Sequence, residues 1–223
     1  MNSHGLVFDD KQSNSLQLVE TGSVKFVKIS QFLSSDDKNT LLGKVMAHKE
    51  AFNPPGVPGN YIGDGTSLML DLDFGKKPSE QNLVDDVCEC LSARIMEQLP
   101  ALLEALGLKP FGIDKCPMTI ISGLNGHYGL PHIDTYSPDM KITVLYYFHN
   151  SPKAYKGGDL ELFESDPDTS IGYKEQPVIR IEHEDNLLLA FTSDTYHGVT
   201  EVEGDASTFE DSRFTTVSFI RSP

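Results

Sequence analysis

Basic residues are scarce in this sequence. It contains 18 Lys and Arg against 33 Asp and Glu, which gives a formal net charge of -15 at pH 7. Nucleic acids and anionic membranes both require a basic surface, so the composition argues against either as a partner. Acidic clusters at 164–168, 182–185 and 201–211 are interpreted as solvated loops, with attraction of a cationic substrate or partner as the alternative.

Long apolar runs and cysteines are also scarce. No window approaches the length of a membrane span, and residues 1–10 lack the basic and apolar segments of a secretory signal. The cysteines number three, and Cys88 and Cys90 stand two positions apart inside a helical pattern. We interpret them as reduced thiols of a cytoplasmic protein; a Cys-x-Cys metal site is the alternative, but it lacks a second pair.

The length of 223 residues favours one domain, 1–223, with a substantial core. Residues 1–22 are polar and without period, which is typical of a flexible tail. The stretch 52–78 is rich in Gly and Pro and contains one short strand candidate. A lid over a substrate site and a simple surface connection both fit it.

The first half of the chain carries helical signals. Residues 23–30 alternate as a strand does, and 34–48 begin with a Ser cap and acidic residues, followed by apolar residues at helical spacing. The longest predicted helix is 79–99, which Pro100 interrupts before a short second helix ends near Gly107.

After this point the pattern changes to short alternating or apolar runs bounded by turn residues. Seven strands are predicted, at 117–122, 141–148, 159–163, 176–181, 186–191, 197–202 and 213–220. Because no helix separates them, we expect an antiparallel sandwich or barrel packed on the preceding helices, in an α+β fold that is mainly β.

The strongest chemical signal is the pair His132 and Asp134. Two positions apart on a strand, both side chains would point to one face and could chelate one ion. Of the seven histidines, His197 is the best third ligand, because it opens a strand just after an apolar strand and a polar turn. Two imidazoles and a carboxylate form a facial triad that leaves positions open for other ligands; the donors suit Fe(II), with zinc and manganese as alternatives.

Arg213 is a second signal. It lies sixteen residues after His197 and opens a strand whose middle is uncharged, so its guanidinium could be buried. A buried guanidinium needs an anionic partner, and a carboxylate matches it best. The alternative is an arginine at a solvated strand end.

Five segments in order resemble the catalytic core of the prolyl-hydroxylase-like branch of the Fe(II)- and 2-oxoglutarate-dependent dioxygenases. They are His132-x-Asp134, 146–150, 157–163, 186–202 and 212–219. Residues 29–42 are similar to the strand and helix that often open such domains. The resemblance implies a double-stranded β-helix, the jelly roll or cupin-like fold, with its core at about 108–223 and supporting N-terminal helices.

The resemblance also implies roles for residues. His132, Asp134 and His197 would hold the iron, with no catalytic side chain beyond these ligands. Arg213 would bind the distal carboxylate of 2-oxoglutarate, and Tyr147 would donate its hydroxyl to the same group.

Lesser candidates surround this set. Thr215 is a minor 2-oxoglutarate ligand, and His127 and Tyr128 are candidates for the pocket wall. Tyr146 should point to the face opposite Tyr147. Some relatives carry a tyrosine about ten residues before the first iron histidine; Ser122 stands there, and the role is not transferred to it.

The activity implied is hydroxylation of a C–H bond in an amino-acid-like small molecule or peptide. Fe(II) would be the cofactor, 2-oxoglutarate and O2 would be consumed to give succinate and CO2, and ascorbate would be a stimulant. Relatives that halogenate replace the iron carboxylate with a small residue, so Asp134 favours hydroxylation. Three alternatives stay open: a hydroxylase of prolyl or other residues in a protein, a metal-binding jelly roll that is not an oxygenase, and a binding module with a vestigial triad. The oligomeric state is not predicted.

Overall fold

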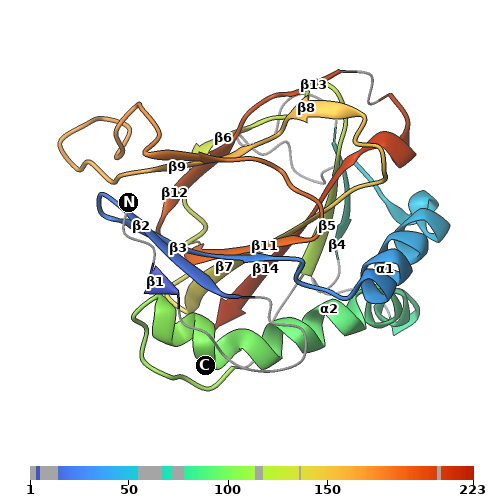
Figure 1. Cartoon of the computed structure of the whole chain (residues 1–223), viewed down its shortest axis with the longest axis horizontal. Helices are drawn as coiled ribbons and strands as arrows, with labels where there is room; N and C mark the ends of the chain where they lie inside the picture. The colour runs from blue at the N-terminus through green and yellow to red at the C-terminus, as the bar shows by residue number, and fades with distance from the viewer. Residues whose placement is uncertain are drawn as a thin grey trace.

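The computed structural model describes residues 4–5, 15–54, 67–71, 78–113, 118–135, 137–204 and 207–223. Two antiparallel sheets face each other, and two helices cover the outer face of the larger one (Figure 1). This is the double-stranded β-helix, a mainly β fold with supporting helices, as predicted.

The larger sheet has eight strands, all paired antiparallel. Their order is β1 (His4–Gly5), β2 (Gln17–Thr21), β3 (Val24–Ser30), β11 (Leu187–Thr192), β7 (Met140–Phe148), β14 (Arg213–Arg221), β5 (Met118–Gly123) and β4 (Ser67–Asp71). The central strand β14 pairs with both β7 and β5, so the last strand in sequence lies inside the sheet.

The smaller sheet forms the opposite layer. Its order is β10 (Ile179–Ile181), β9 (Leu160–Phe163), β12 (Tyr196–Val199) and β6 (Gly129–His132). A separate two-stranded ribbon joins β13 (Val202–Gly204) to β8 (Tyr155–Gly157).

The first helix, α1 (Ser35–Ala47), begins as predicted. The hydroxyl of Ser34 accepts a hydrogen bond from the backbone N–H of Asp37 at 3.1 Å, which satisfies one of the free donors of the first turn. Leu41 and Val45 are fully buried one turn apart, so the apolar face of α1 packs on the sheet. Short 3-10 turns follow α1 at Lys49–Ala51 and precede β14 at Phe209–Asp211.

The predicted break at Pro100 is wrong, because α2 (Pro78–Ala105) continues through it. A proline inside a helix removes one backbone hydrogen bond and costs about 3 kcal/mol. Leu99, Leu102 and Leu103 around it are all buried in the core against the sheet. Burial of these side chains offsets the cost, which local propensity does not reveal.

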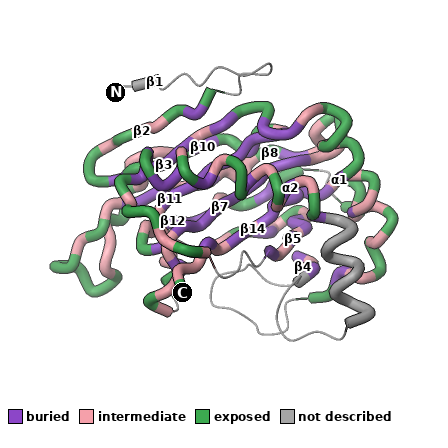
Figure 2. The backbone as a smooth tube through the Cα atoms, turned by 90° about the horizontal axis from the view of Figure 1, so that it is seen from below, coloured by how far each residue is buried: buried purple, intermediate pink, exposed green. Residues whose placement is uncertain are grey.

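Two apolar cores lie on the two faces of the large sheet. The outer core packs Ile142, Val144 and Tyr146 of β7 against the helices, while the inner core packs Leu145 and Tyr147 against the small sheet. Tyr146 and Tyr147 therefore point to opposite faces, as predicted from strand alternation. Figure 2 shows the buried residues concentrated along β3, β11, β7 and β14.

Several boundaries differ from the prediction. Gln17–Thr21, expected in a flexible tail, pair with β3 as strand β2. The predicted strand 197–202 is divided between β12 and β13, which belong to different sheets. Strands β6 and β8 were not predicted. Most of the Gly- and Pro-rich stretch 52–78, the predicted lid, lies outside the described residues.

Two further expectations concern single side chains. His183, inside an acidic cluster interpreted as solvated, is fully buried, whereas its neighbours Glu182 and Glu184 are exposed. Cys88 and Cys90 are free cysteines, and burial raises the pKa of the Cys88 thiol to about 12, so it is not a ready thiolate ligand.

Candidate active site

The structure brings together the three predicted metal ligands. His132 ends β6 and His197 lies directly opposite it in β12, so the sheet register alone places the two rings side by side, 4.3 Å between centroids. Asp134 lies two residues beyond the end of β6, where its backbone N–H donates to the Ser193 carbonyl at 2.9 Å. One ligand atom from each residue lies within 4.8 Å of the others, and no other such cluster occurs among the described residues.

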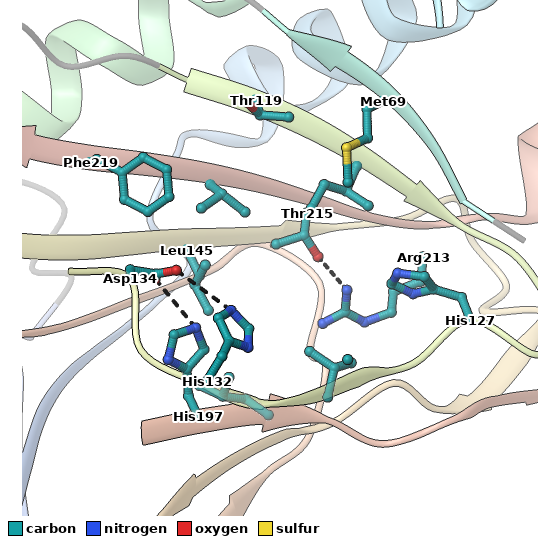
Figure 3. A pocket seen from close by; sticks show the side chains of 15 residues that line it. Met69, Thr119, His127, His132, Asp134, Leu145, His197, Arg213, Thr215 and Phe219 are labelled. Atoms are coloured by element: carbon teal, nitrogen blue, oxygen red, sulfur yellow. Dashed lines mark hydrogen bonds and ion pairs between the residues drawn. The ribbon is translucent and has the colours of Figure 1, made fainter. Parts of the chain in front are cut away.

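Backbone carbonyls orient both imidazoles. His132 Nδ1 lies 2.8 Å from the Leu130 carbonyl, and His197 Nδ1 lies 3.0 Å from the Thr195 carbonyl. A carbonyl oxygen only accepts, so each Nδ1 carries a hydrogen, and Nε2 is the nitrogen that can bind a metal when the ring is neutral. Those Nε2 atoms lie 3.5 Å and 3.3 Å from the oxygens of Asp134 (Figure 3). Both rings thus present their metal-binding nitrogen to one point.

The carboxylate is oriented from the opposite sheet. Thr143 of β7 donates its hydroxyl hydrogen to Asp134 Oδ2 at 2.8 Å. The same hydroxyl also lies 3.1 Å from Ser193 Oγ, a second acceptor within its reach. Asp134 is 4% exposed. The hydrogen bond from Thr143 fixes the buried carboxylate and leaves Oδ1 without a competing hydroxyl donor, as supporting residues around metal ligands commonly do.

The electrostatics favour an ionised carboxylate. Burial raises the pKa of Asp134, but the hydrogen bond from His132 and the nearby imidazoles outweigh it, so the pKa is below its ordinary value. Burial is also the largest effect on His132, where it lowers the pKa, yet contacts with Asp134 and Leu130 raise it overall. For His197, burial dominates and the pKa is lowered. A metal ion binds the ionised carboxylate and neutral imidazoles, so its binding would release any proton held by His132.

The cluster opens into a cavity of about 240 Å³ between the two sheets. Its wall is mainly apolar, and most of it comes from inward-facing side chains of the large sheet. These include Met69, Ile121, Leu145, Val217 and Phe219 (Figure 3). Such a wall excludes water and strengthens the electrostatic interactions of the few polar groups inside.

Arg213 lies in the same cavity, away from the triad (Figure 3). It is 2% exposed, and its Nε donates to the Gly158 carbonyl at 2.6 Å and its Nη1 to Thr215 Oγ1 at 2.7 Å. Among the described residues it makes no ion pair. A buried guanidinium without a counter-ion is unfavourable, so this end of the cavity is suited to an anion.

Gly158 creates the space for this arginine. Its φ is +67°, a conformation that side-chain-bearing residues rarely adopt, and an added Cβ would lie 2.5 Å from Arg213 Cδ. The neighbouring Gly157 also has a positive φ, so the two glycines have a structural role in this turn.

Tyr147 lies beside Arg213 but not in the cavity wall. Thr215 is its direct partner across β7 and β14, and the Arg213 guanidinium lies 5.2 Å from its ring centroid. The ring stacks on His183 at 4.3 Å, and the hydroxyl has no hydrogen-bond partner of ordinary geometry among the described residues. Burial raises its pKa to about 12, so the hydroxyl stays protonated and can donate.

The remaining candidate residues lie in different environments. His127 is buried and lines the cavity, whereas Tyr128 is 39% exposed and does not. Ser122 is buried and its hydroxyl is 2.7 Å from that of Ser212. Sequence reasoning missed Thr143, although its place two residues before Leu145 and four before Tyr147 puts it on the same inward face of β7.

A double-stranded β-helix that carries two histidines on its small sheet and a carboxylate just beyond one of those strands, open to a cavity between the sheets, defines a class of non-haem metal proteins. Comparison with known families agrees: residues 118–221 match the model of the 2OG-Fe(II) oxygenase superfamily. This part of the chain is therefore similar to that superfamily, whose members take Fe(II), 2-oxoglutarate and O2, and the three clustered residues are consistent with an iron site.

Similar proteins include an uncharacterised PKHD-type hydroxylase of Synechocystis sp., 25% identical over 95% of this chain. The chain spans 66% of the length of that relative. Among solved structures, a Pseudomonas putida prolyl-4-hydroxylase superimposes with a TM-score of 0.60 at 16% identity, over 90% of this chain and 94% of the other. A Trichoplax adhaerens prolyl hydroxylase superimposes with a TM-score of 0.60 at 19% identity, over 88% and 83%.

The likeness to these solved structures shows the fold.

Neither α1 nor the described part of α2 has an apolar stretch long enough for a membrane crossing.

Proposed function

We propose that this protein is an Fe(II)- and 2-oxoglutarate-dependent oxygenase that hydroxylates a C–H bond of an amino-acid-like small molecule or a peptide, with release of succinate and CO2. The observation that carries the proposal is a cavity with two imidazole nitrogens and a carboxylate oxygen clustered in its wall. Elsewhere in the same cavity lies a buried guanidinium that has no counter-ion among the described residues.

The residues present fit the iron. In this proposal His132 Nε2, His197 Nε2 and an oxygen of Asp134 hold Fe(II) and leave open positions on the cavity side. When bound, iron with 2-oxoglutarate supplies the activation of O2 and the oxidation of the C–H bond. The protein supplies the ligand geometry, through the Nδ1 hydrogen bonds of the two imidazoles and the hydrogen bond from Thr143 to the carboxylate.

The residues also fit 2-oxoglutarate. Arg213 pairs with no anion in the described part of the chain, and its guanidinium would bind the distal carboxylate in the same cavity as the metal ligands. Thr215 accepts a hydrogen bond from one side of the guanidinium, and Tyr147, beside it, has a protonated hydroxyl that can donate. The apolar wall between the two ends suits the methylene chain of the co-substrate and keeps water out.

A peptide as substrate draws support from the fold. The Trichoplax adhaerens prolyl hydroxylase was solved with a peptide fragment of a hypoxia-inducible factor, so this architecture can present a C–H bond of a peptide to the metal. Hydroxylation of a prolyl or other residue in a protein is therefore the second candidate function.

The test is formation of succinate from 2-oxoglutarate with Fe(II) and O2, with and without pools of free amino acids and peptides. Asp134→Ala removes the carboxylate ligand, and Asp139→Ala, at a half-buried aspartate close by in sequence, is the matched control. We expect succinate from wild type and Asp139→Ala, more with the correct pool, and none from Asp134→Ala. Equal turnover in Asp134→Ala would refute the site, and a wild type that binds metal but not 2-oxoglutarate would indicate a metal-binding jelly roll with another function.

A further inference from the structure

His127 is a buried polar side chain that the proposed site does not yet use. It is 4% exposed and lines the same cavity as Arg213 (Figure 3). Its backbone is fixed by two hydrogen bonds, from its N–H to the Leu124 carbonyl at 2.9 Å and from the Val202 N–H to its carbonyl at 2.8 Å. The imidazole is therefore presented to the cavity by a rigid turn.

Gly123 makes room for this ring. A Cβ at Gly123 would lie 2.6 Å from His127 Nδ1 and 3.0 Å from its Cγ, closer than real contacts allow. Gly123 ends β5 directly opposite Arg213 of β14, so the glycine places the imidazole at the guanidinium end of the cavity.

Nδ1 of the ring lies against Gly123, is fully shielded from solvent and has no hydrogen-bond partner in the described part of the chain, so Nε2 is the nitrogen that can donate to a ligand in the cavity. Leaving a buried polar group unsatisfied is unfavourable, and native proteins rarely do so without a functional reason. Burial, followed by the positive charge of Arg213, lowers the pKa of His127 to about 3. The imidazole is therefore neutral at physiological pH, and a neutral imidazole has one N–H to donate.

An anionic ligand is the partner that both side chains would share. The Nε of Arg213 and one hydrogen of its Nη1 are already used by Gly158 and Thr215. A carboxylate bound by the remaining guanidinium hydrogens still has acceptor positions free on its two oxygens. A neutral N–H donor beside the guanidinium can fill one of them without adding charge.

We infer that His127 is a second hydrogen-bond donor to the distal carboxylate of 2-oxoglutarate and that it contributes to the choice of a dicarboxylic 2-oxo acid as co-substrate. The inference rests on the proposed function, since it assigns a residue to the same site. It predicts that the contribution of His127 depends on the ligand having a distal carboxylate.

Calorimetric titration of the Mn(II)-loaded protein tests this without turnover. Two ligands are compared: 2-oxoglutarate, and 2-oxopentanoate, which has the same five carbons but no distal carboxylate. The variant His127→Phe keeps a ring and removes both nitrogens, His127→Gln keeps an N–H donor, and His48→Phe, at the end of α1, is the matched control.

We expect His127→Phe to weaken 2-oxoglutarate binding by about 10- to 100-fold, the range for a hydrogen bond to a charged group. Binding of 2-oxopentanoate should change little, His127→Gln should recover part of the loss, and His48→Phe should behave as wild type. In wild type, the ring nitrogens of His127 should shift in 15N NMR spectra on addition of 2-oxoglutarate.

If His127→Phe weakens the binding of both ligands equally, the ring only packs against its neighbours and donates no hydrogen bond to the distal carboxylate. An unchanged affinity of His127→Phe for 2-oxoglutarate would also overturn the inference. If Arg213→Met abolishes 2-oxoglutarate binding while His127→Phe and His127→Gln do not affect it, the proposed function stands and only the role of His127 fails. If wild type binds Mn(II) but not 2-oxoglutarate, both fail.

Discussion

Addition of one methyl group at Gly158 should displace Arg213 and thereby weaken 2-oxoglutarate binding. The Cβ of Gly158→Ala would lie 2.5 Å from Arg213 Cδ and 2.7 Å from its Nε. The guanidinium must then move, and the hydrogen bond from Nε to the Gly158 carbonyl, 2.6 Å long, is broken or distorted.

The expected loss of stability in Gly158→Ala is the sum of two separable effects. A left-handed backbone costs a residue with a side chain about 1–2 kcal/mol. Loss of a hydrogen bond from a charged group adds about 1.5–3 kcal/mol, so Gly158→Ala should lower the free energy of unfolding by roughly 3–5 kcal/mol. Gly107→Ala is a matched control, because its φ is +71° but a Cβ there meets nothing within 4 Å. It should lose only the backbone contribution, about 1–2 kcal/mol.

Urea unfolding of the metal-free protein gives the stability of each variant, and titration of the Mn(II)-loaded protein gives the affinity for 2-oxoglutarate. We expect Gly158→Ala to bind 2-oxoglutarate at least about tenfold more weakly, the loss that corresponds to about 1.4 kcal/mol, and Gly107→Ala to bind as wild type does. Wild-type affinity in a folded Gly158→Ala, or equal destabilisation by both substitutions, would refute the role of Gly158 in holding Arg213.

Three other outcomes are expected. Thr143→Val keeps the side-chain shape but removes the hydrogen bond to Asp134 Oδ2, so Mn(II) affinity should fall by about 10- to 100-fold in calorimetry, as is usual for groups that orient metal ligands; unchanged affinity would contradict the orienting role. Wild type with Mn(II) and 2-oxoglutarate at a hundred times its Kd should gain about 2.7 kcal/mol of stability and about 5–10 °C in Tm, and Arg213→Met should gain nothing; a similar shift in the variant would show that Arg213 does not hold the ligand. His127 and His183 are buried with lowered pKa values, mainly through burial, so the unfolded chain binds protons more readily and stability should fall as the pH drops below about 6.5. For His127, with a folded pKa of about 3, the loss at pH 5 is about 2 kcal/mol, and the difference between the urea stabilities at pH 7.5 and pH 5 should shrink by that amount in His127→Gln; an identical pH dependence would contradict its burial as a neutral group.

Local chemistry predicted much of the site. His132, Asp134 and His197 do converge, and Arg213 is buried, as their residue types and flanking strands indicated. Strand alternation was an incomplete reason for including Asp134, because this residue lies beyond the strand and reaches the cluster through its hydrogen bond to Ser193.

Features set by distant contacts were not predictable in this way. The helix continues through Pro100 because Leu102 and Leu103 are buried against the sheet, and no local propensity contains that contact. Likewise, nothing near His127 in the sequence shows that its ring rests on Gly123 or faces Arg213, since both follow from the pairing of β5 with β14. Tyr147 was placed on the correct face by alternation, but its packing against His183 depends on a residue 36 positions away.

The position of β14 has a consequence for biosynthesis. This strand follows all others in sequence, yet it pairs with β7 on one side and β5 on the other. During translation those two strands emerge earlier, and their inner edges remain without a hydrogen-bonding partner until residues 213–221 leave the ribosome. Because Arg213 is the first residue of β14, closure of the sheet and delivery of the guanidinium to the cavity are one event. A nascent chain in which all three candidate metal ligands are already present therefore still cannot form the complete cavity.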